Sequence, residues 1–229
     1  MPLVPLTRNA FEELIPFYAT GAQYVYCWGK FRDFIQQLLI SVVAVTVIAF
    51  VGGFLGSGLQ LTLGIIAALY WLWLPIVKAS TRNVKYRRYK YSGFWQGRVL
   101  DVYVTEELMG TEETANARGE LVIVENRERR LNLEVGDKTG FVTTMQVPLT
   151  RNHQVVQRGL VAQMLVMSNE SDLSYVAECS DIYLPSRNLW ISDYPYVRRD
   201  IFLEIAQQLK AAKGASPEPR SRTSQDSYQ

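Results

Sequence analysis

The residues that could perform catalysis are few and widely spaced. His153, the only histidine, lies in a predicted loop beside Arg151 and Asn152, and the two cysteines, Cys27 and Cys179, are far apart in sequence. A zinc site takes several Cys or His ligands at characteristic short spacings, which this set does not offer. A serine hydrolase of the G-x-S-x-G type is also excluded, because that pattern is absent. We therefore predict no catalytic residues, no metal, no cofactor and no enzyme activity.

The densest group of charges is KYRRYKY at 85–91. Bases mixed with aromatic rings can bind single-stranded nucleic acid. Here the segment follows a long apolar run directly, and bases in that position are attracted to anionic lipid headgroups by about 1 kcal/mol each. We therefore predict contact with membrane lipids and no nucleic acid. The predicted membrane-surface residues are Trp28, Lys30, Arg32, Trp71, Trp73, Lys78, Arg82, Lys85, Arg87, Arg88 and Lys90.

The apolar run of the sequence must place these predicted membrane-surface residues at the bilayer. Residues 34–77 contain no charged side chain, and the run is bracketed by Asp33 and Lys78. One membrane crossing takes about 20 apolar residues, so the run is roughly twice the necessary length. Glycines gather near its middle, where a turn would be placed. We predict a hairpin of two transmembrane helices, at about 34–55 and 59–77.

Small residues inside the run are spaced for close helix packing. Gly52 and Gly56 are four apart, as are Gly64 and Ala68. Such spacing lets two helices approach closely, so we predict that these residues pack the two helices together, with a dimer contact as the alternative. The run contains no ionisable residue, and ion or proton paths normally need such groups. The composition therefore favours an anchor over a channel.

Basic residues flank both ends of the run, whereas its central turn is uncharged. By the positive-inside rule, both termini are expected on the cytoplasmic side of the membrane, or on the stromal side in a plastid.

From Ser92 onward the pattern is that of short strands. Leu131, Leu133 and Val135 alternate with polar residues, as in a half-buried strand. The acidic stretch 106–119 and ENRERR at 125–130 are predicted as a loop and a hairpin connection. An apolar stripe from Val197 to Leu209 predicts an amphipathic C-terminal helix. The expected fold is a membrane α-helical hairpin followed by a soluble all-β or α+β domain. That domain is a pleckstrin-homology-like barrel with a C-terminal helix, or alternatively an SH3-like or OB-like barrel.

The chain is thus expected to contain five parts. They are an N-terminal interfacial segment (1–33), the transmembrane hairpin (34–77), a basic juxtamembrane segment (78–91), the β-rich domain with its helix (92–213) and a disordered tail (214–229).

Three stretches, PLVPLTRNAFEELIPF, YCWGKFRDF and ENRERRLNLEVGD, resemble a membrane protein family of cyanobacteria and plastids. The layout is also similar to that of the Ycf4 family of photosystem I assembly proteins. The resemblance implies a thylakoid location and a role in building or maintaining photosynthetic complexes. It also implies a membrane protein complex as partner, either a photosystem or its assembly intermediates.

We therefore expect a non-catalytic interaction or assembly factor, integral to the thylakoid or plasma membrane, that presents its β domain to a partner. The alternative is a small transport or channel subunit. In that case an oligomer would line its path with the polar residues of the run, which are Gln36, Gln37, Ser41, Thr46 and Thr62.

Overall fold

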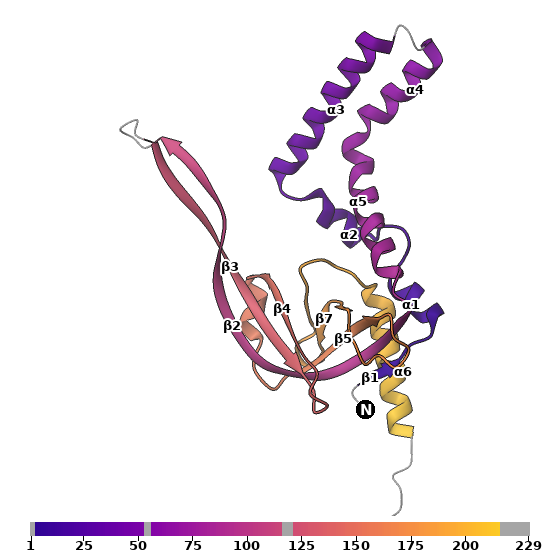
Figure 1. Cartoon of the computed structure of the whole chain (residues 1–229), viewed down its shortest axis with the longest axis vertical. Helices are drawn as coiled ribbons and strands as arrows, with labels where there is room; N and C mark the ends of the chain where they lie inside the picture. The colour runs from indigo at the N-terminus through magenta and orange to yellow at the C-terminus, as the bar shows by residue number, and fades with distance from the viewer. Residues whose placement is uncertain (1–2, 53–55, 116–120, 216–229) are drawn as a thin grey trace, which may run out of the picture.

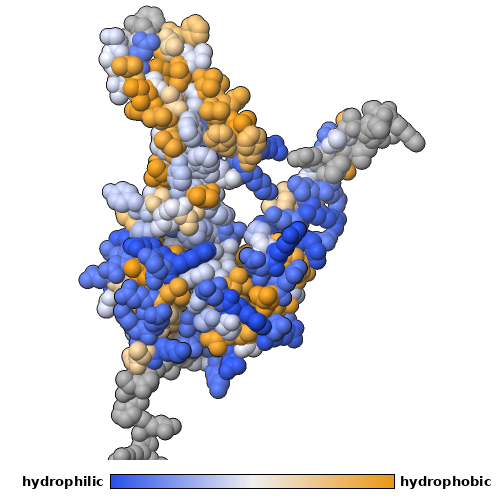
Figure 2. Space-filling model, turned by 180° about the vertical axis from the view of Figure 1, so that it is seen from behind, coloured by the Kyte–Doolittle hydropathy of each residue, from blue (hydrophilic) through white to orange (hydrophobic). Residues whose placement is uncertain are grey.

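A computed structural model describes residues 3–52, 56–115 and 121–215. Helices at one end of the molecule stand on an antiparallel sheet at the other, and a long two-stranded arm rises from the sheet on the side of the helices (Figure 1). The helical end is largely apolar on its surface, whereas polar residues cover most of the sheet end in the view from behind (Figure 2).

The N-terminal segment forms β1 (Leu3–Pro5), α1 (Arg8–Leu14) and α2 (Gly21–Trp28). Thr7 caps α1, because its side chain accepts the Ala10 N–H. A second cap begins α2, where Thr20 and Gln23 exchange side-chain-to-backbone hydrogen bonds. Both caps fix where the chain turns before it reaches the apolar run.

The first helix of the apolar run is α3 (Phe31–Val51), which begins three residues before the predicted boundary. It is the one single helix of the described residues that is long and apolar enough to cross a membrane. Its large side chains point outward, with Val43 54%, Val47 54% and Phe50 83% exposed. The protein itself therefore leaves this helix largely uncovered.

The second predicted span is divided between α4 (Ser57–Ala68) and α5 (Tyr70–Arg87), which meet at a bend of 69°. Leu69 lies between them with φ −90° and ψ 10°, outside the regular helical region. The indole N–H of Trp73 donates to the carbonyl of Ile66 at 2.9 Å, which supplies a partner at the broken end of α4. The second predicted helix, at about 59–77, is therefore not continuous, and only the bent pair as a whole passes the length and composition test for a span.

The described strands form one antiparallel sheet in the order β4-β3-β2-β5-β7-β8, with β1 paired to β2 and β6 paired to β5. The strands are β2 (Tyr91–Ala115), β3 (Leu121–Gly136), β4 (Val142–Pro148), β5 (Val161–Ser168), β6 (Glu178–Cys179), β7 (Ile182–Leu184) and β8 (Leu189–Ile191). Two 3-10 turns, η2 (Arg151–Val155) and η3 (Pro185–Arg187), and the helix α6 (Arg199–Ala215) complete the fold.

The arm corrects two predictions. Residues 106–115 lie in β2 and residues 125–130 lie in β3, so neither forms the loop or the hairpin connection expected of it. The charges sit on strands because opposite charges can meet along the ribbon, as where the Arg130 guanidinium lies 2.9 Å from the Glu107 carboxylate. The rest of the predicted loop, 116–119, lies outside the described residues.

Two apolar clusters cover opposite faces of the sheet. The first contains Trp95 and Met164, and the second contains Phe94 and Leu165 together with residues of α1 and α6. Neighbouring residues of β2 and β5 therefore face opposite sides, and β5 is buried on both. Glycine is required at 97, since a Cβ there would lie 2.3 Å from the Trp95 ring.

An antiparallel β domain with a C-terminal helix is confirmed. Among the described strands, none joins the two ends of the sheet, β4 and β8. The predicted tail begins inside α6, which continues to Ala215, and its remainder lies outside the described residues.

Candidate functional site

The helices and the sheet meet at a cluster that we call the tyrosine joint: Tyr26 of α2, Arg82 and Tyr86 of α5, and Tyr194 and Tyr196 of the loop after β8. The Tyr194 ring lies edge-on to those of Tyr26 and Tyr196, at 5.1 and 4.9 Å between centroids. The Tyr86 hydroxyl donates to that of Tyr196 at 3.0 Å, and the Arg82 guanidinium lies 4.7 Å from the Tyr194 centroid. Such contacts stabilise by about 0.5–1.5 kcal/mol each, so together they fix the helices on the sheet.

A buried pair of amides reinforces the joint. The Gln23 Nε2 donates to Asn83 Oδ1 at 3.0 Å, and the Asn83 Nδ2 donates to Gln23 Oε1 at 2.8 Å. The Gln23 Nε2 also donates to the carbonyl of Pro195 at 2.9 Å. Both side chains are 1% exposed, so these hydrogen bonds take the place of bonds to water. The pair therefore links α2 and α5 to the loop that carries Tyr194 and Tyr196.

Asp181 lies beneath the same loop and is fully buried. Its Oδ1 accepts the Tyr196 N–H at 3.0 Å, whereas its Oδ2 has no hydrogen-bond partner among the described residues. Burial raises the pKa of this carboxyl to about 7, although the N–H groups of Tyr196 and Val197 and the charge of Arg199 oppose that rise. A buried carboxyl with one oxygen unpaired is costly to the fold, and this one therefore needs an explanation.

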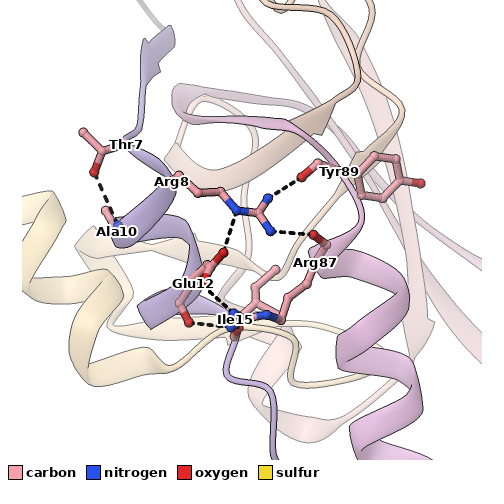
Figure 3. A network of polar contacts seen from close by, with 7 residues as sticks. All are labelled: Thr7, Arg8, Ala10, Glu12, Ile15, Arg87 and Tyr89. Carbon is pink, nitrogen blue, oxygen red and sulfur yellow. Dashed lines mark hydrogen bonds and ion pairs between the residues drawn. The ribbon is translucent and has the colours of Figure 1, made fainter.

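A second polar network ties α1 to the end of α5 (Figure 3). The Arg87 guanidinium donates to the carbonyls of Glu12 and Ile15 at 3.0 and 2.8 Å and lies 2.6 Å from the Glu12 carboxylate. The Arg8 guanidinium donates to the carbonyls of Arg87 and Tyr89 at 2.9 and 2.7 Å, which serves the open C-terminal end of α5. The two arginines also hold the pKa of Glu12 below its usual range, chiefly through the hydrogen bond from Arg8.

Arg87→Lys is expected to destabilise the protein by roughly 1–3 kcal/mol, because a lysine cannot reproduce the several directed donors of a guanidinium. The control is Arg88→Lys, since Arg88 is exposed and should tolerate the change. Unfolding by denaturant in mild-detergent micelles measures the difference. Equal effects of the two substitutions would contradict the role assigned to Arg87.

An open cleft, which we call the seam, runs between β4 and β6. A cavity of about 400 Å³ is lined by 141–146 on one side and by 176–179 on the other. It adjoins a cavity of about 900 Å³ over Trp95, with which it shares the three lining residues Phe141, Val142 and Val176. The two walls approach each other on the inside, where the Thr143 hydroxyl is a hydrogen-bond partner of the Cys179 thiol.

The lining of the seam is acidic. Burial raises the pKa of the Cys179 thiol to about 11, so this cysteine is not a thiolate at neutral pH. Among the described residues, no Lys or Arg lines either cavity. The carboxylates that line them are Asp137, Asp172, Glu178, Asp181 and Asp193.

A family model described as "Family of unknown function (DUF8619)" matches residues 4–214. The chain belongs to this family. No curated protein and no solved structure matches the chain. The family match spans the apolar helices, the joint and the sheet together.

The predicted aromatic residues gather where α2, α3 and α5 meet. The Trp28 ring stacks on that of Phe34 at 5.3 Å between centroids, and Trp71 lies edge-on to Phe34 at 5.8 Å. Trp73 lies in the same helix as Trp71 and bonds across the bend at Leu69. Their packing places them together at the base of the hairpin, and their contact with lipid remains a prediction.

The predicted bases separate into two groups. Arg82 and Arg87 are engaged by the joint and by α1. Lys30 begins α3, where its backbone N–H donates to the Asp33 carboxylate at 2.8 Å. Besides Arg82, the predicted bases exposed on the surface are Lys30, Arg32, Lys78, Lys85, Arg88 and Lys90. These six remain our candidates for lipid headgroup contact.

Of the small residues predicted to pack the helices, only Gly52 makes a close approach. A Cβ on Gly52 would lie 2.5 Å from the Gln60 side chain, whose Nε2 donates to the carbonyl of Ala49 at 3.3 Å. Gly56 adopts φ +81° ahead of α4. Gly64 and Ala68 line an open apolar groove of about 420 Å³ between α3 and α4.

The polar residues proposed for a channel do not share one face. Gln37 and Ser41 are buried, whereas Gln36, Thr46 and Thr62 are exposed. The Thr46 and Thr62 hydroxyls donate to the carbonyls four residues before them in their own helices. The arrangement in a single chain thus gives the channel alternative no support.

His153, the one candidate for acid–base chemistry, caps η2. Its Nδ1 accepts the Thr150 N–H at 3.3 Å, and burial lowers its pKa. Within the described ranges, no group of three or more His, Cys, Asp or Glu residues is placed to hold a metal.

Sequence reasoning missed the joint and the seam. The T-x-x-Q pattern of Thr20 and Gln23 is a readable helix-start signal, and it would have placed Gln23 at the beginning of a helix. No signal of comparable strength marks Asn83 or Asp181, because their partners lie on other elements.

Proposed function

We propose that the protein is a non-catalytic membrane-anchored interaction or assembly factor. The observation that carries this proposal is the apolar surface of α3, which the fold leaves exposed along a whole helix. An uncovered apolar surface of this size indicates a membrane or a protein partner. α3 packs against α5, and the tyrosine joint fixes α2 and α5 to the sheet, which carries the acidic seam and the charged arm.

In this proposal the joint serves to hold the sheet at a set position relative to the bilayer. α3 enters the membrane, and the exposed bases on α5 and after it, Lys78, Lys85 and Arg88, contact the headgroups. The sheet then faces partners at the membrane surface. Photosystems or their assembly intermediates, in a thylakoid or plasma membrane, are the partners that the sequence resemblance suggests.

The bent pair α4–α5 is proposed as the second span, which places both termini on the cytoplasmic or stromal side. Protease protection of epitope tags at the two ends tests this in sealed vesicles. Two spans give the same protection to both tags, whereas a single span gives opposite results.

Val43→Asp combined with Val47→Asp is expected to release the protein from membranes. Each charge at the centre of a membrane helix costs roughly 2.5–3.5 kcal/mol. The measurement is the fraction that resists extraction by alkaline carbonate. Val155→Asp, on an exposed residue of η2, is the matched control. If the double variant resists extraction as well as the wild type, α3 is not required to anchor the chain.

Purification from membranes in mild detergent tests the interaction role. We expect a stoichiometric membrane protein complex to accompany the chain. A chain that is recovered alone from cells grown under several conditions would count against the proposal.

A further inference from the structure

β4 is an end strand whose outer edge faces the seam. It pairs with β3 on one side only. Along an antiparallel ladder, residues that bond to the partner strand alternate with residues whose backbone groups point away from it. Leu149 bonds toward β3, because its N–H donates to the Arg129 carbonyl, and every second residue before it does the same. The N–H and C=O groups of Val142, Thr144 and Gln146 therefore point away from β3, into the seam. No described strand pairs with this edge.

The seam follows the outer edge of β4. The smaller cavity follows the strand from Phe141 to Gln146 along its length. The larger cavity continues over Trp95, which is 2% exposed and donates its indole N–H to the Asp137 carboxylate at 2.7 Å. A long cleft with a free backbone edge suits a peptide strand better than a compact small molecule.

The residues that line the two cavities favour a cationic ligand. Asp137, Asp172, Glu178, Asp181 and Asp193 line the two cavities, and no described Lys or Arg does. Asp181 is fully buried in this lining with its Oδ2 unpaired. Arg199, whose charge lowers the pKa of Asp181, lies over the Trp190 ring at 5.3 Å. A cationic donor from outside would complete the hydrogen bonds of Asp181.

We infer that the seam binds an extended segment of a partner protein, which pairs with the outer edge of β4 and directs a lysine or arginine side chain toward Asp181. This inference rests on the proposed interaction function and names the chemistry of its partner. A second copy of β4 fits less well, because Val142–Pro148 carries no charge. Asp181 also accepts the Tyr196 N–H, so the bound segment would adjoin the tyrosine joint.

The test uses the full-length chain in mild-detergent micelles and a phage-displayed library of random nine-residue peptides. The affinity of the selected peptides is then measured for the Thr144→Pro and Thr144→Val variants. Proline removes the outward N–H of Thr144 and is tolerated on the open side of an edge strand, whereas valine keeps that donor. Thermal unfolding of both variants confirms that they are folded.

We expect selected peptides to be enriched in Lys or Arg and in β-branched residues. Thr144→Pro should weaken their binding by about tenfold or more, and Thr144→Val by less than about twofold. Asp181→Asn should reduce the preference for a peptide with Lys over its twin with Glu, which tests the site independently of the backbone change.

Three results would overturn the inference: no peptide selected, peptides without a cation, or equal binding to the proline and valine variants. Each of these is separable from failure of the proposed function. That function fails when alkaline carbonate extracts the wild-type chain from membranes, and this outcome does not depend on the seam.

Discussion

Asp181→Asn is expected to stabilise the protein at pH 8 and to do so much less at pH 5. Burial raises the pKa of this carboxyl to about 7, well above the value near 4 of an unfolded aspartate. Between these values the folded state holds a proton that the unfolded state has released, so stability falls as the pH rises from about 4 to about 7. Asparagine keeps the acceptor for the Tyr196 N–H and does not ionise. Its advantage should therefore grow by roughly 2 kcal/mol between the two pH values.

Unfolding by denaturant in detergent micelles at pH 5, 6.5 and 8 measures this effect. Asp193→Asn is the matched control, because Asp193 lines the same cavity but is exposed. The control should show the same small difference from the wild type at all three pH values. A parallel pH dependence of wild type and Asp181→Asn would mean that Asp181 is ionised in the folded protein.

Periodicity predicts an element when one side of it is buried and the other is not. β3 alternates at Leu131, Leu133 and Val135 because these residues enter the core while Glu134 does not. The stripe on α6 is readable for the same reason, since Phe202 and its neighbours pack on the sheet. The antiparallel domain and its terminal helix could therefore be predicted.

The arm could not be predicted by the same argument. Its strands extend beyond the core, so they have no buried side to impose alternation on Glu106 to Thr111 or on Glu125 to Arg130. What holds them is pairing between strands, including the ion pair of Arg130 with Glu107. Such pairing depends on register, which a single sequence does not state.

The bend at Leu69 also could not be predicted from the sequence. No proline or glycine occupies that position, and hydropathy is uniform on both sides of it. The break is accommodated by the Trp73 indole, which donates to Ile66 across it. Only the three-dimensional path of α5 toward the sheet shows why the run changes direction there.

The joint and the seam share a wall. Tyr196 contributes its hydroxyl to the joint and its backbone N–H to Asp181, and it also lines the smaller cavity. A segment bound at Asp181 therefore contacts the loop that positions the helices. This connection is the physical route by which a partner at the sheet could influence how the anchor is held.

Gln23→Ala and Asn83→Ala are each expected to destabilise the protein by roughly 2–4 kcal/mol, because each leaves the other amide buried without its partner. Gln23 also loses its bond to the carbonyl of Pro195, so its substitution should loosen the joint as a whole. The double variant should cost less than the sum of the two, by about 1–3 kcal/mol, since the second substitution removes a group that the first left unpaired. A double-mutant cycle by denaturant unfolding in micelles measures this coupling.

Gln36→Ala, on an exposed glutamine of α3, should change stability by less than about 0.5 kcal/mol. Strictly additive costs would show that the two amides do not act as a pair, and the helices would then be held on the sheet by the tyrosine rings and the Arg87 network alone.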